Sequence, residues 1–414
     1  MSQSDPAPEQ PNDETPSLIK PGGKVDPEAL RQAAKIEEST GEDDGLRRAT
    51  FTLGRDLRKR LDRYLKDRID FMSRNQLQRL ITEGGVTVNG RTAKASTSLR
   101  LGDVVEVVIP PPPAKEIQPE QIPLEVLYED EQIIVINKQA DIIVHPARSH
   151  LGGTMLNALA WHFLNESSSG GALSNVGAEL ARPGVVHRLD RHTTGVIIFA
   201  KDEEAHWRLG RQFEQRTTDK RYLALVQGEV EPVADLIDAP LGPHPSSAKG
   251  LREKYVVRYD EMGKASLTLY RVRERFEGYS LVELELKTGR THQIRIHMTH
   301  LGYPLVGDDM YSGKPATSAK LGKDKPARLA IEAETGSETI MDRQALHATT
   351  LTIDHPKTGE RMTFQAPVPP DLARLVDLLR RYRPGDGPLS PAGSTVDLAA
   401  VIPNSANSGT EATD

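Results

Sequence analysis

A run of four prolines, Pro110–Pro113, divides this chain of 414 residues into a short N-terminal part and a long C-terminal part. Proline has no backbone N–H and its ring fixes φ, so neither a helix nor a central strand can continue through the run. A stiff, extended linker is the conformation that remains. The sequence therefore predicts two domains, joined by a proline-rich linker at residues 111–117.

The two ends of the chain differ in composition from the rest. Residues 1–50 hold 6 Lys or Arg against 11 Asp or Glu and few large apolar residues, while residues 385–414 are rich in Gly, Pro, Ser, Ala and Thr. Such segments bury too little apolar surface to fold by themselves. We expect a disordered acidic arm at 1–50, folded domains at 51–110 and 118–384, and a disordered tail at 385–414. Residues 313–342 read as a surface insertion.

Composition excludes several classes of protein. There is no cysteine, which removes disulfides, thiol nucleophiles and cysteine-bound metals. No apolar run approaches the roughly 20 residues that a membrane helix needs. The N-terminus has no basic segment followed by an apolar one, as a secretory signal would require. The sequence predicts a cytoplasmic protein that does not bind membranes, and we expect a monomer.

Residues 51–110 are the one segment that is basic as a whole, with 12 Lys or Arg against 7 Asp or Glu. Leucines from Leu57 onward recur at helical spacing, Ser73 is placed to cap a second helix, and Gly84-Gly85 would end it. Val86–Gly90 reads as a strand that enters a hairpin turn, and Leu101–Ile109 supplies a further turn and strand. A basic helical hairpin without a ligand is the plainer reading.

The phrases R-N-Q-L-Q-R-L-I, G-G-V-T-V-N-G and L-R-L-G-D-V-V-E-V resemble the RNA-binding domain named after ribosomal protein S4, also called the αL motif. The resemblance implies an RNA-binding surface on basic helices. The residues that we expect there are Arg58, Lys59, Arg63, Arg74 and Arg79.

The long C-terminal part alternates strands with helices. Glu125–Lys138 reads as a hairpin, Glu203–Arg216 as a helix, Lys220–Val226 as a strand, and Leu281–Leu286 as a strand with strict alternation. We expect an α+β domain built on a mostly antiparallel mixed sheet with flanking helices, preceded by the small αL-motif domain.

The segment His187–Gly195 sets one carboxylate, Asp190, among two arginines and two imidazoles, and an apolar run follows at Val196–Ala200. Cations close by keep a carboxylate ionised, so Asp190 is suited to act as a nucleophile or a base. The apolar run reads as a buried strand that would hold the loop firmly. A surface loop with local salt bridges is the alternative.

Three further segments place polar groups at strand ends: Lys220–Tyr222, Thr288–Arg295, and Asn137-Lys138 with His145. An aromatic ring at Tyr222 could stack on a base, although core packing is the ordinary role of such a tyrosine. The histidine spacings do not match a zinc-protease motif, and nearby arginines would repel a cation. We expect no metal.

The motifs H-R-L-D-R-H-T-T-G, K-R-Y-L-A-L-V-Q-G, L-K-T-G-R-T-H-Q-I-R-I-H, L-G-Y-P-L-V-G-D-D-M-Y and Q-A-L-H-A occur in the order seen in the Rlu family of pseudouridine synthases. The resemblance runs from about residue 52 to 370 and is closest to the branch that acts on ribosomal large-subunit RNA. Two positions depart from the family pattern: Thr194 stands where serine is usual, and Asn137–Asp141 replaces the common N-K-P-A-G.

The resemblance implies that the protein converts uridine in RNA to pseudouridine without a cofactor. Asp190 would be the catalytic aspartate, Arg295 its ion-pair partner, and Tyr222 the ring that stacks on a flipped base. Arg188 would fill the gap left in the RNA. His187, Lys220, Arg290 and His292 would contact the substrate or shape its site.

Two other functions are weighed against this one. An RNA scaffold or ribosome-assembly factor would use the basic segment equally well, but would not need Asp190, Tyr222 and Arg295 together. A glycosidase would need a second catalytic acid beside Asp190. The motifs that carry the resemblance supply none, so we rank the glycosidase last.

Overall fold

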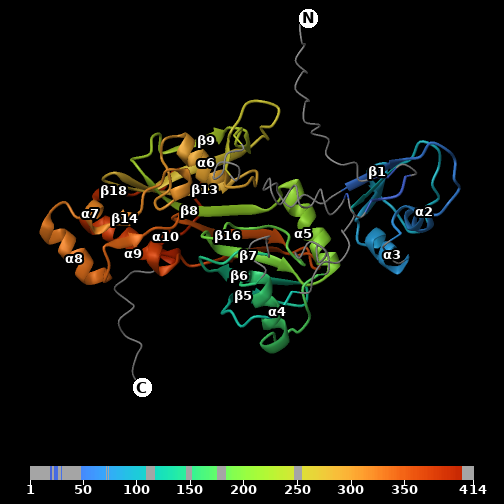
Figure 1. The fold of residues 1–414 in the computed structure, drawn as a ribbon, viewed down its shortest axis with the longest axis horizontal. Helices are drawn as coiled ribbons and strands as arrows, with labels where there is room; N and C mark the ends of the chain where they lie inside the picture. Colours follow the sequence, from blue (N-terminus) through green and yellow to red (C-terminus); the bar gives the residue numbers. More distant parts are fainter. Residues whose placement is uncertain are drawn as a thin grey trace, which may run out of the picture. The chain divides into compact units, whose positions relative to one another are not determined.

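The computed structural model describes residues 19–20, 23–26, 29, 48–70, 72, 74–108, 117–145, 152–174, 183–246 and 254–402. The chain divides into two compact units, residues 1–39 with 47–112 and residues 40–46 with 113–414 (Figure 1). The four-proline run, the linker expected at 111–117 (apart from residue 117) and the Ser73 cap lie outside the described residues. None of the described helices is long and apolar enough to cross a bilayer.

The N-terminal unit is a four-stranded antiparallel sheet with two helices. The strands, in sheet order, are β1 (Arg48–Thr52), β4 (Val104–Val108), β2 (Val86–Val88) and β3 (Arg91–Thr92), and the helices are α2 (Leu61–Arg68) and α3 (Arg74–Thr82). Asn89 and Gly90 both have positive φ, 52° and 72°, as a two-residue hairpin turn requires. The predicted strand, turn and helices are therefore confirmed.

Two boundaries in this unit differ from the sequence prediction. The first helix begins at Leu61 rather than near Leu57, because Arg60 has an extended backbone. Strand β1 begins at Arg48, inside the segment predicted to be a disordered arm. Its alternating burial, with Ala49 and Phe51 inward, comes from pairing with β4 and has no strong local signal.

The C-terminal unit is built on one ten-stranded sheet. Its path is β18 (Pro384–Pro388), β12 (Leu267–Phe276), β13 (Tyr279–Leu286), β8 (Asp219–Gln227), β16 (Leu346–Asp354), β7 (Thr194–Ala200), β6 (Ile133–Lys138) and β5 (Glu125–Glu129), while β17 (Arg361–Gln365) pairs with β16 and β9 (Ala234–Asp238) with β12. Only β16 and β7 are parallel within this sheet of described strands. The predicted α+β fold with a mostly antiparallel mixed sheet is confirmed.

Helices cover both faces of the sheet (Figure 1). One core cluster joins β6, β7 and β8 to α4 (Met155–Asn165) and α6 (Gln293–His300). On the opposite face, α5 (Glu203–Gln215) packs in a second cluster and α9 (Pro370–Tyr382) in a third. A strand covered on both faces is apolar at every position, and β7 is buried throughout. The buried strand predicted at Val196–Ala200 is confirmed.

Residues 385–402 have regular structure, so the prediction of a disordered tail at 385–414 is wrong for this part, while residues 403–414 lie outside the described residues. Strand β18 pairs with β12, and α10 (Leu398–Val401) follows it. The segment covers a buried ion pair of the sheet: Arg273 donates to Glu283 and, at 2.8 Å, to the carbonyl of Val396. Burial of Val396, Val401 and Ile402 depends on this tertiary contact, which the Gly-, Pro- and Ser-rich composition does not signal.

The segment 313–342, expected to be a surface insertion, has regular structure of its own. It contains α7 (Ser318–Leu321), α8 (Lys325–Thr335) and a ladder of β14 (Ala316–Thr317) with β15 (Thr339–Met341). Leu321, Ile331 and Met341 are buried in the cluster around α9. The remaining elements of the unit are β10 (Leu241–Pro243), β11 (Tyr255–Val257) and the 3-10 helix η2 (Asp309–Tyr311).

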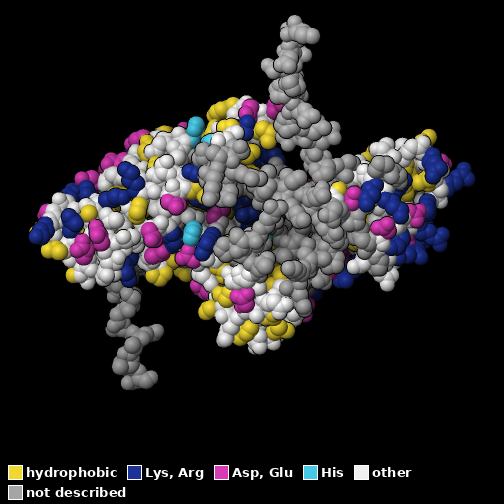
Figure 2. Space-filling model, viewed as in Figure 1, with side chains coloured by type: hydrophobic (Ala, Val, Ile, Leu, Met, Phe, Trp, Pro, Cys, Tyr) yellow, Lys and Arg dark blue, Asp and Glu magenta, His cyan; other side chains and the backbone are white. Residues whose placement is uncertain are grey.

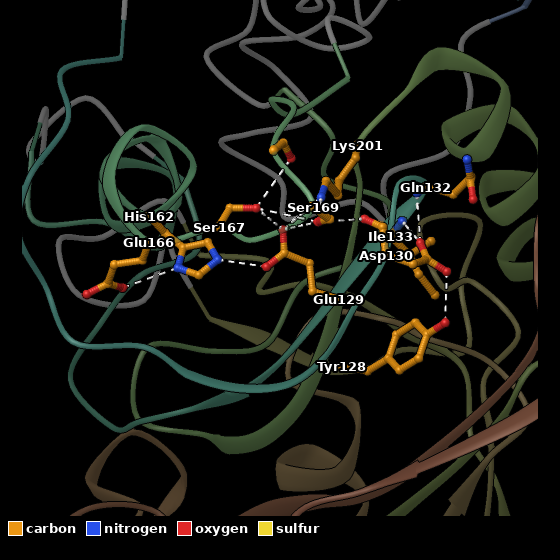
Figure 3. Close-up of polar contacts among 11 residues, drawn as sticks. Tyr128, Glu129, Asp130, Gln132, Ile133, His162, Glu166, Ser167, Ser169 and Lys201 are labelled. Carbon is orange, nitrogen blue, oxygen red and sulfur yellow. Dashed lines mark hydrogen bonds and ion pairs between the residues drawn. The ribbon is translucent and has the colours of Figure 1, made fainter.

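A polar network holds the hairpin of β5 and β6 to the rest of this unit (Figure 3). The Glu129 carboxylate accepts from Lys201 Nζ at 2.7 Å and from Ser169 Oγ at 2.9 Å, and it contacts His162 Nε2 at 2.8 Å. Lys201 directly follows β7, and His162 lies on α4. The Glu129 carboxylate, with only 11% of its side chain exposed, therefore links an edge strand, the residue that follows a central strand, and a helix.

Candidate functional site

The loop that carries Asp190 is anchored at several points before β7 begins. Thr193 donates a backbone hydrogen bond to the carbonyl of Asp190 at 3.1 Å, and the buried Nζ of Lys138 donates to the carbonyl of Arg191 at 2.9 Å. Gly195 has φ 110°, and a Cβ there would lie 2.1 Å from the Ala348 oxygen. The glycine of the T-T-G motif is therefore required for β7 to approach β16.

Asp190 and Arg295 meet as the resemblance implies. Arg295 Nη1 donates to Asp190 Oδ2 at 3.0 Å. Arg295 also donates from Nε and Nη2 to the two oxygens of Asp308, at 2.7 and 2.8 Å. The side chains of Arg295 and Asp308 are buried, whereas that of Asp190 is 22% exposed. The site thus presents one partly exposed carboxylate, that of Asp190, which accepts a hydrogen bond from the buried guanidinium of Arg295.

The charges around Asp190 keep it ionised. Burial raises the pKa of the Asp190 carboxyl, but the opposing charges of His292, when it is protonated, and of Arg295 outweigh burial and lower the pKa to about 2. Burial lowers the pKa of His292 below its ordinary value, so this imidazole is neutral near pH 7. Arg295 is therefore the permanent cation beside Asp190, and the site can supply a base or nucleophile rather than a proton donor.

His292 lies at the N-terminus of α6 with φ 54° and faces Asp190. Its Nδ1 is 2.9 Å from the Tyr311 hydroxyl, and its Nε2 is 3.9 Å from Asp190 Oδ1. The backbone N–H of Tyr255 donates to the same hydroxyl at 3.3 Å, so the hydroxyl proton can be donated to Nδ1. In that arrangement the His292 Nε2–H points toward Asp190.

Tyr222 lies on the face of the sheet that α6 covers. Tyr222, Leu189 and Ile294 belong to one core cluster, and the last two are the chain neighbours of Asp190 and Arg295. In the sheet, Ala348 of β16 pairs with Tyr222 on one side and with Gly195 on the other. The fold therefore brings the segments of all three expected catalytic residues to one face.

The four other residues expected at the site differ in their surroundings. Arg188 is exposed, and its charge acts on Asp190. Arg290 is half-buried, and its Nε makes no hydrogen bond within the described part of the chain. His187 stacks on Phe213 at 4.6 Å and accepts from the backbone of Ile198, which favours a structural role. Lys220 Nζ lies 5.7 Å from the same Phe213 ring.

Two residues at this site, Asp308 and Tyr311, have positions that the sequence did not predict. Both belong to the L-G-Y-P-L-V-G-D-D-M-Y motif, from which no role for either residue was predicted. The only hint in the sequence was the pair of adjacent acids, Asp308 and Asp309, shortly before the aromatic Tyr311. Nothing in the sequence separates Asp308, which is buried, from Asp309, which is exposed. Among the described residues, no group of three or more His, Cys, Asp or Glu side chains is arranged to hold a metal ion.

The five residues expected to contact RNA lie on or next to α2 and α3 of the N-terminal unit. Arg58, Arg63, Arg74 and Arg79 are exposed and Lys59 is half-buried; Lys and Arg side chains gather on this unit in Figure 2. Buried Asp62 accepts from Arg74 at 2.9 Å, and also from Arg60 and Gln78 at 3.1 and 2.8 Å. Asp62 thereby joins the two helices and holds the guanidinium groups of Arg60 and Arg74 at the surface.

Known families and proteins resemble this chain over most of its length. A family model described as RNA pseudouridylate synthase matches residues 132–300, and the S4 domain model matches residues 59–105. The RNA pseudouridine synthase YlyB of Bacillus subtilis is 37% identical over 323 residues, which cover 78% of this chain and 95% of the relative. Ribosomal large subunit pseudouridine synthase D of Pasteurella multocida is 36% identical over 325 residues, covering 78% of this chain and 92% of the relative.

Among solved structures, human RNA pseudouridylate synthase domain containing 4 aligns with a TM-score of 0.45 at 23% identity, covering 62% of this chain and 93% of that chain. The sequence relatives decide the family, because they align over nearly their whole length. The chain belongs to the RNA pseudouridylate synthase family, a family of isomerases, and it carries an S4 domain ahead of the synthase domain.

Proposed function

We propose that this protein isomerises specific uridines of large-subunit ribosomal RNA to pseudouridine, with Asp190 as the reacting carboxylate. The observation that carries the proposal is the contact of 3.0 Å between a partly exposed, ionised Asp190 and a buried Arg295. The choice of RNA rests on relatives such as the large subunit synthase of Pasteurella multocida. We expect the protein to act as a monomer in the cytoplasm.

The isomerisation needs no oxidant, reductant or added group. The bond from ribose carbon one to ring nitrogen one breaks, the base turns, and ring carbon five joins the same ribose carbon. Ring carbon five loses a proton and ring nitrogen one gains one, so atoms and charge balance. Asp190 could add to the ribose or remove a ribose proton as the base leaves; both need the ionised carboxylate that Arg295 supports.

The target base would have to leave the RNA stack to reach Asp190. Flipping a base costs a few kcal/mol, which stacking and phosphate contacts would offset. In the proposal Tyr222 stacks on the flipped base, and exposed Arg188 fills the gap that it leaves. The buried Nε of Arg290 donates to no described residue, so its N–H is suited to donate a hydrogen bond to the substrate. His292 shapes the site beside Asp190.

The proposal is tested with large-subunit ribosomal RNA that carries tritium at uracil carbon five. The wild type should release tritium, and Asp190→Asn should lower the rate by about 100-fold or more, since it removes the charge with little change of shape. Asp309→Asn, which alters an exposed carboxylate, is the matched control and should behave as the wild type. Normal release by Asp190→Asn would remove Asp190 from the mechanism.

The choice of RNA is tested separately with small-subunit ribosomal RNA labelled in the same way. We expect release from the large-subunit RNA only. Mapping pseudouridines in cells that lack the protein should then show which large-subunit positions are lost. Equal release from both RNAs would retain the activity but contradict the proposed substrate.

A further inference from the structure

We propose that Asp308 is a positioning residue, which holds the Arg295 guanidinium so that a single nitrogen, Nη1, is presented to Asp190. This inference rests on the proposed role of Asp190. The observation behind it is the division of the guanidinium edges: Nε and Nη2 go to Asp308, and Nη1 goes to Asp190.

The planar guanidinium makes this division effective. Its five N–H groups lie in one rigid fork, so fixing the edge formed by Nε and Nη2 also fixes the direction of Nη1. Arg295 is only 6% exposed at its side chain, and water cannot readily replace a lost partner. Without the Asp308 carboxylate, buried N–H groups would lose their acceptors, and the guanidinium would turn to share more of them with Asp190.

Asp308 is itself held in place. It follows Gly307 and opens η2, where its Oδ1 accepts from the backbone N–H of Tyr311 at 3.3 Å. Its carbonyl accepts from Gly313 at 2.7 Å. The Tyr311 ring lies 4.9 Å from the Arg295 guanidinium carbon, a distance at which a ring face attracts a cation. The short turn therefore supplies both the acceptor and the ring that contact Arg295.

The charges give Asp308 a second effect on Asp190. One guanidinium stands between two carboxylates, so the positive charge of Arg295 is already balanced by the fully buried Asp308 side chain. Asp190 is kept ionised and oriented, yet it retains more of its negative charge than it would beside a lone arginine. A carboxylate in this state is better suited to add to the ribose or to take its proton.

The test measures kcat and KM on the tritiated RNA for Asp308→Asn, Arg295→Lys and the double variant. Lysine cannot divide its donors between two carboxylates as the fork does. We expect each single variant to lower kcat by about 100-fold, with KM changed by less than about 3-fold. The kcat of the double variant should lie within about 3-fold of the kcat of Arg295→Lys, because Asp308 acts through Arg295. Asp309→Asn should match the wild type.

Wild-type kcat in Asp308→Asn, or losses that multiply in the double variant, would overturn the inference. A measurement on the wild type covers the case in which Asp308→Asn does not fold. With ¹⁵N-labelled arginine, the Arg295 Nε–H, assigned by its absence in Arg295→Lys, should exchange with solvent slowly. Exchange as fast as that of exposed arginines would also overturn it. If the wild type released no tritium, the proposed function would fail, while the exchange measurement would still test the contact.

Discussion

At the scale of single residues, the site depends on which side chains are ionised. Asp190, Arg295 and Asp308 form one chain of charge-assisted hydrogen bonds, and His292 is neutral beside them because burial lowers its pKa. Lys138 is similar: burial lowers its pKa to about 7, yet its amine still contacts the carbonyl of Arg191. The polar groups around Asp190 are thus held by hydrogen bonds within the protein.

Tyr222 provides a prediction at this scale. If its ring stacks on the flipped base, Tyr222→Phe should keep kcat/KM within about 3-fold of the wild type, because the aromatic face remains. Tyr222→Leu should lower it by about 10- to 100-fold, since stacking contributes about 1–3 kcal/mol per base. The measurement is tritium release under single-turnover conditions.

A control separates stacking from core packing. Tyr279 is as buried as Tyr222, with 8% exposure each, but it belongs to the cluster on the opposite face of the sheet. Tyr279→Leu should lower stability as Tyr222→Leu does and leave the rate unchanged. Equal losses of rate in the two leucine variants would assign Tyr222 to the core alone.

At the scale of elements, buried ion pairs decide how strands and segments are joined. Strand β13 alternates apolar and acidic residues, a pattern that predicts one solvent-exposed face. The strand is nevertheless buried along nearly its whole length. Its acids are paired instead: Glu283 with Arg273, and Glu285 with Arg221 and Arg271. The acidic residues of β13 therefore indicate arginine partners on the neighbouring strands β12 and β8. One of these arginines, Arg273, also contacts the C-terminal segment at Val396.

Glu129 gives a prediction on stability and pH. Burial raises the pKa of Glu129, but hydrogen bonds from Lys201, Ser167, His162 and Ser169 lower it to about 2, below its ordinary value of 4.5. A lowered pKa in the folded state stabilises the protein above pH 4.5, and this contribution disappears as pH falls through about 2. Glu129→Gln should lower the free energy of unfolding at pH 7 by about 3–5 kcal/mol, because Lys201 loses its buried partner.

The measurement is urea denaturation followed by tryptophan fluorescence. Both tryptophans of the chain, Trp161 and Trp207, lie in the C-terminal unit and report on it alone. The difference between variant and wild type should shrink between pH 4.5 and pH 2. Glu131→Gln, which changes an exposed acid in the same turn, should have almost no effect. A pH-independent difference would show that Glu129 does not act through its charge.

At the scale of the whole molecule, charge is divided unevenly. The chain has a net charge of −6, but residues 51–110 carry an excess of Lys and Arg. Binding to an RNA backbone depends on such a local excess and weakens as salt rises. The S4 domain would therefore supply affinity, and the synthase domain would supply the chemistry.

Arg63 tests this division of labour. It is exposed on α2, so Arg63→Ala should weaken RNA binding at about 0.1 M salt and reduce the slope of log K against log salt by about 1. The rate of tritium release at saturating RNA should not change. Lys357→Ala, which removes an exposed charge from the synthase domain, is the control for net charge. An unchanged slope in Arg63→Ala would remove Arg63 from the RNA-binding surface.

Local sequence signals were sufficient for much of this protein. Periodicity predicted β7, α5 and the hairpin of β5 and β6, since both faces of a covered strand and one stripe of a helix must be apolar. The charged residues around Asp190 pointed to that carboxylate, and the resemblance led to its partner Arg295; the fold brings the two together although 105 positions separate them. The order at residues 385–402 and the difference between Asp308 and Asp309 were decided only by tertiary structure. Each depends on a buried partner distant in the chain, such as Arg295 or Arg273, and no local pattern records that partner.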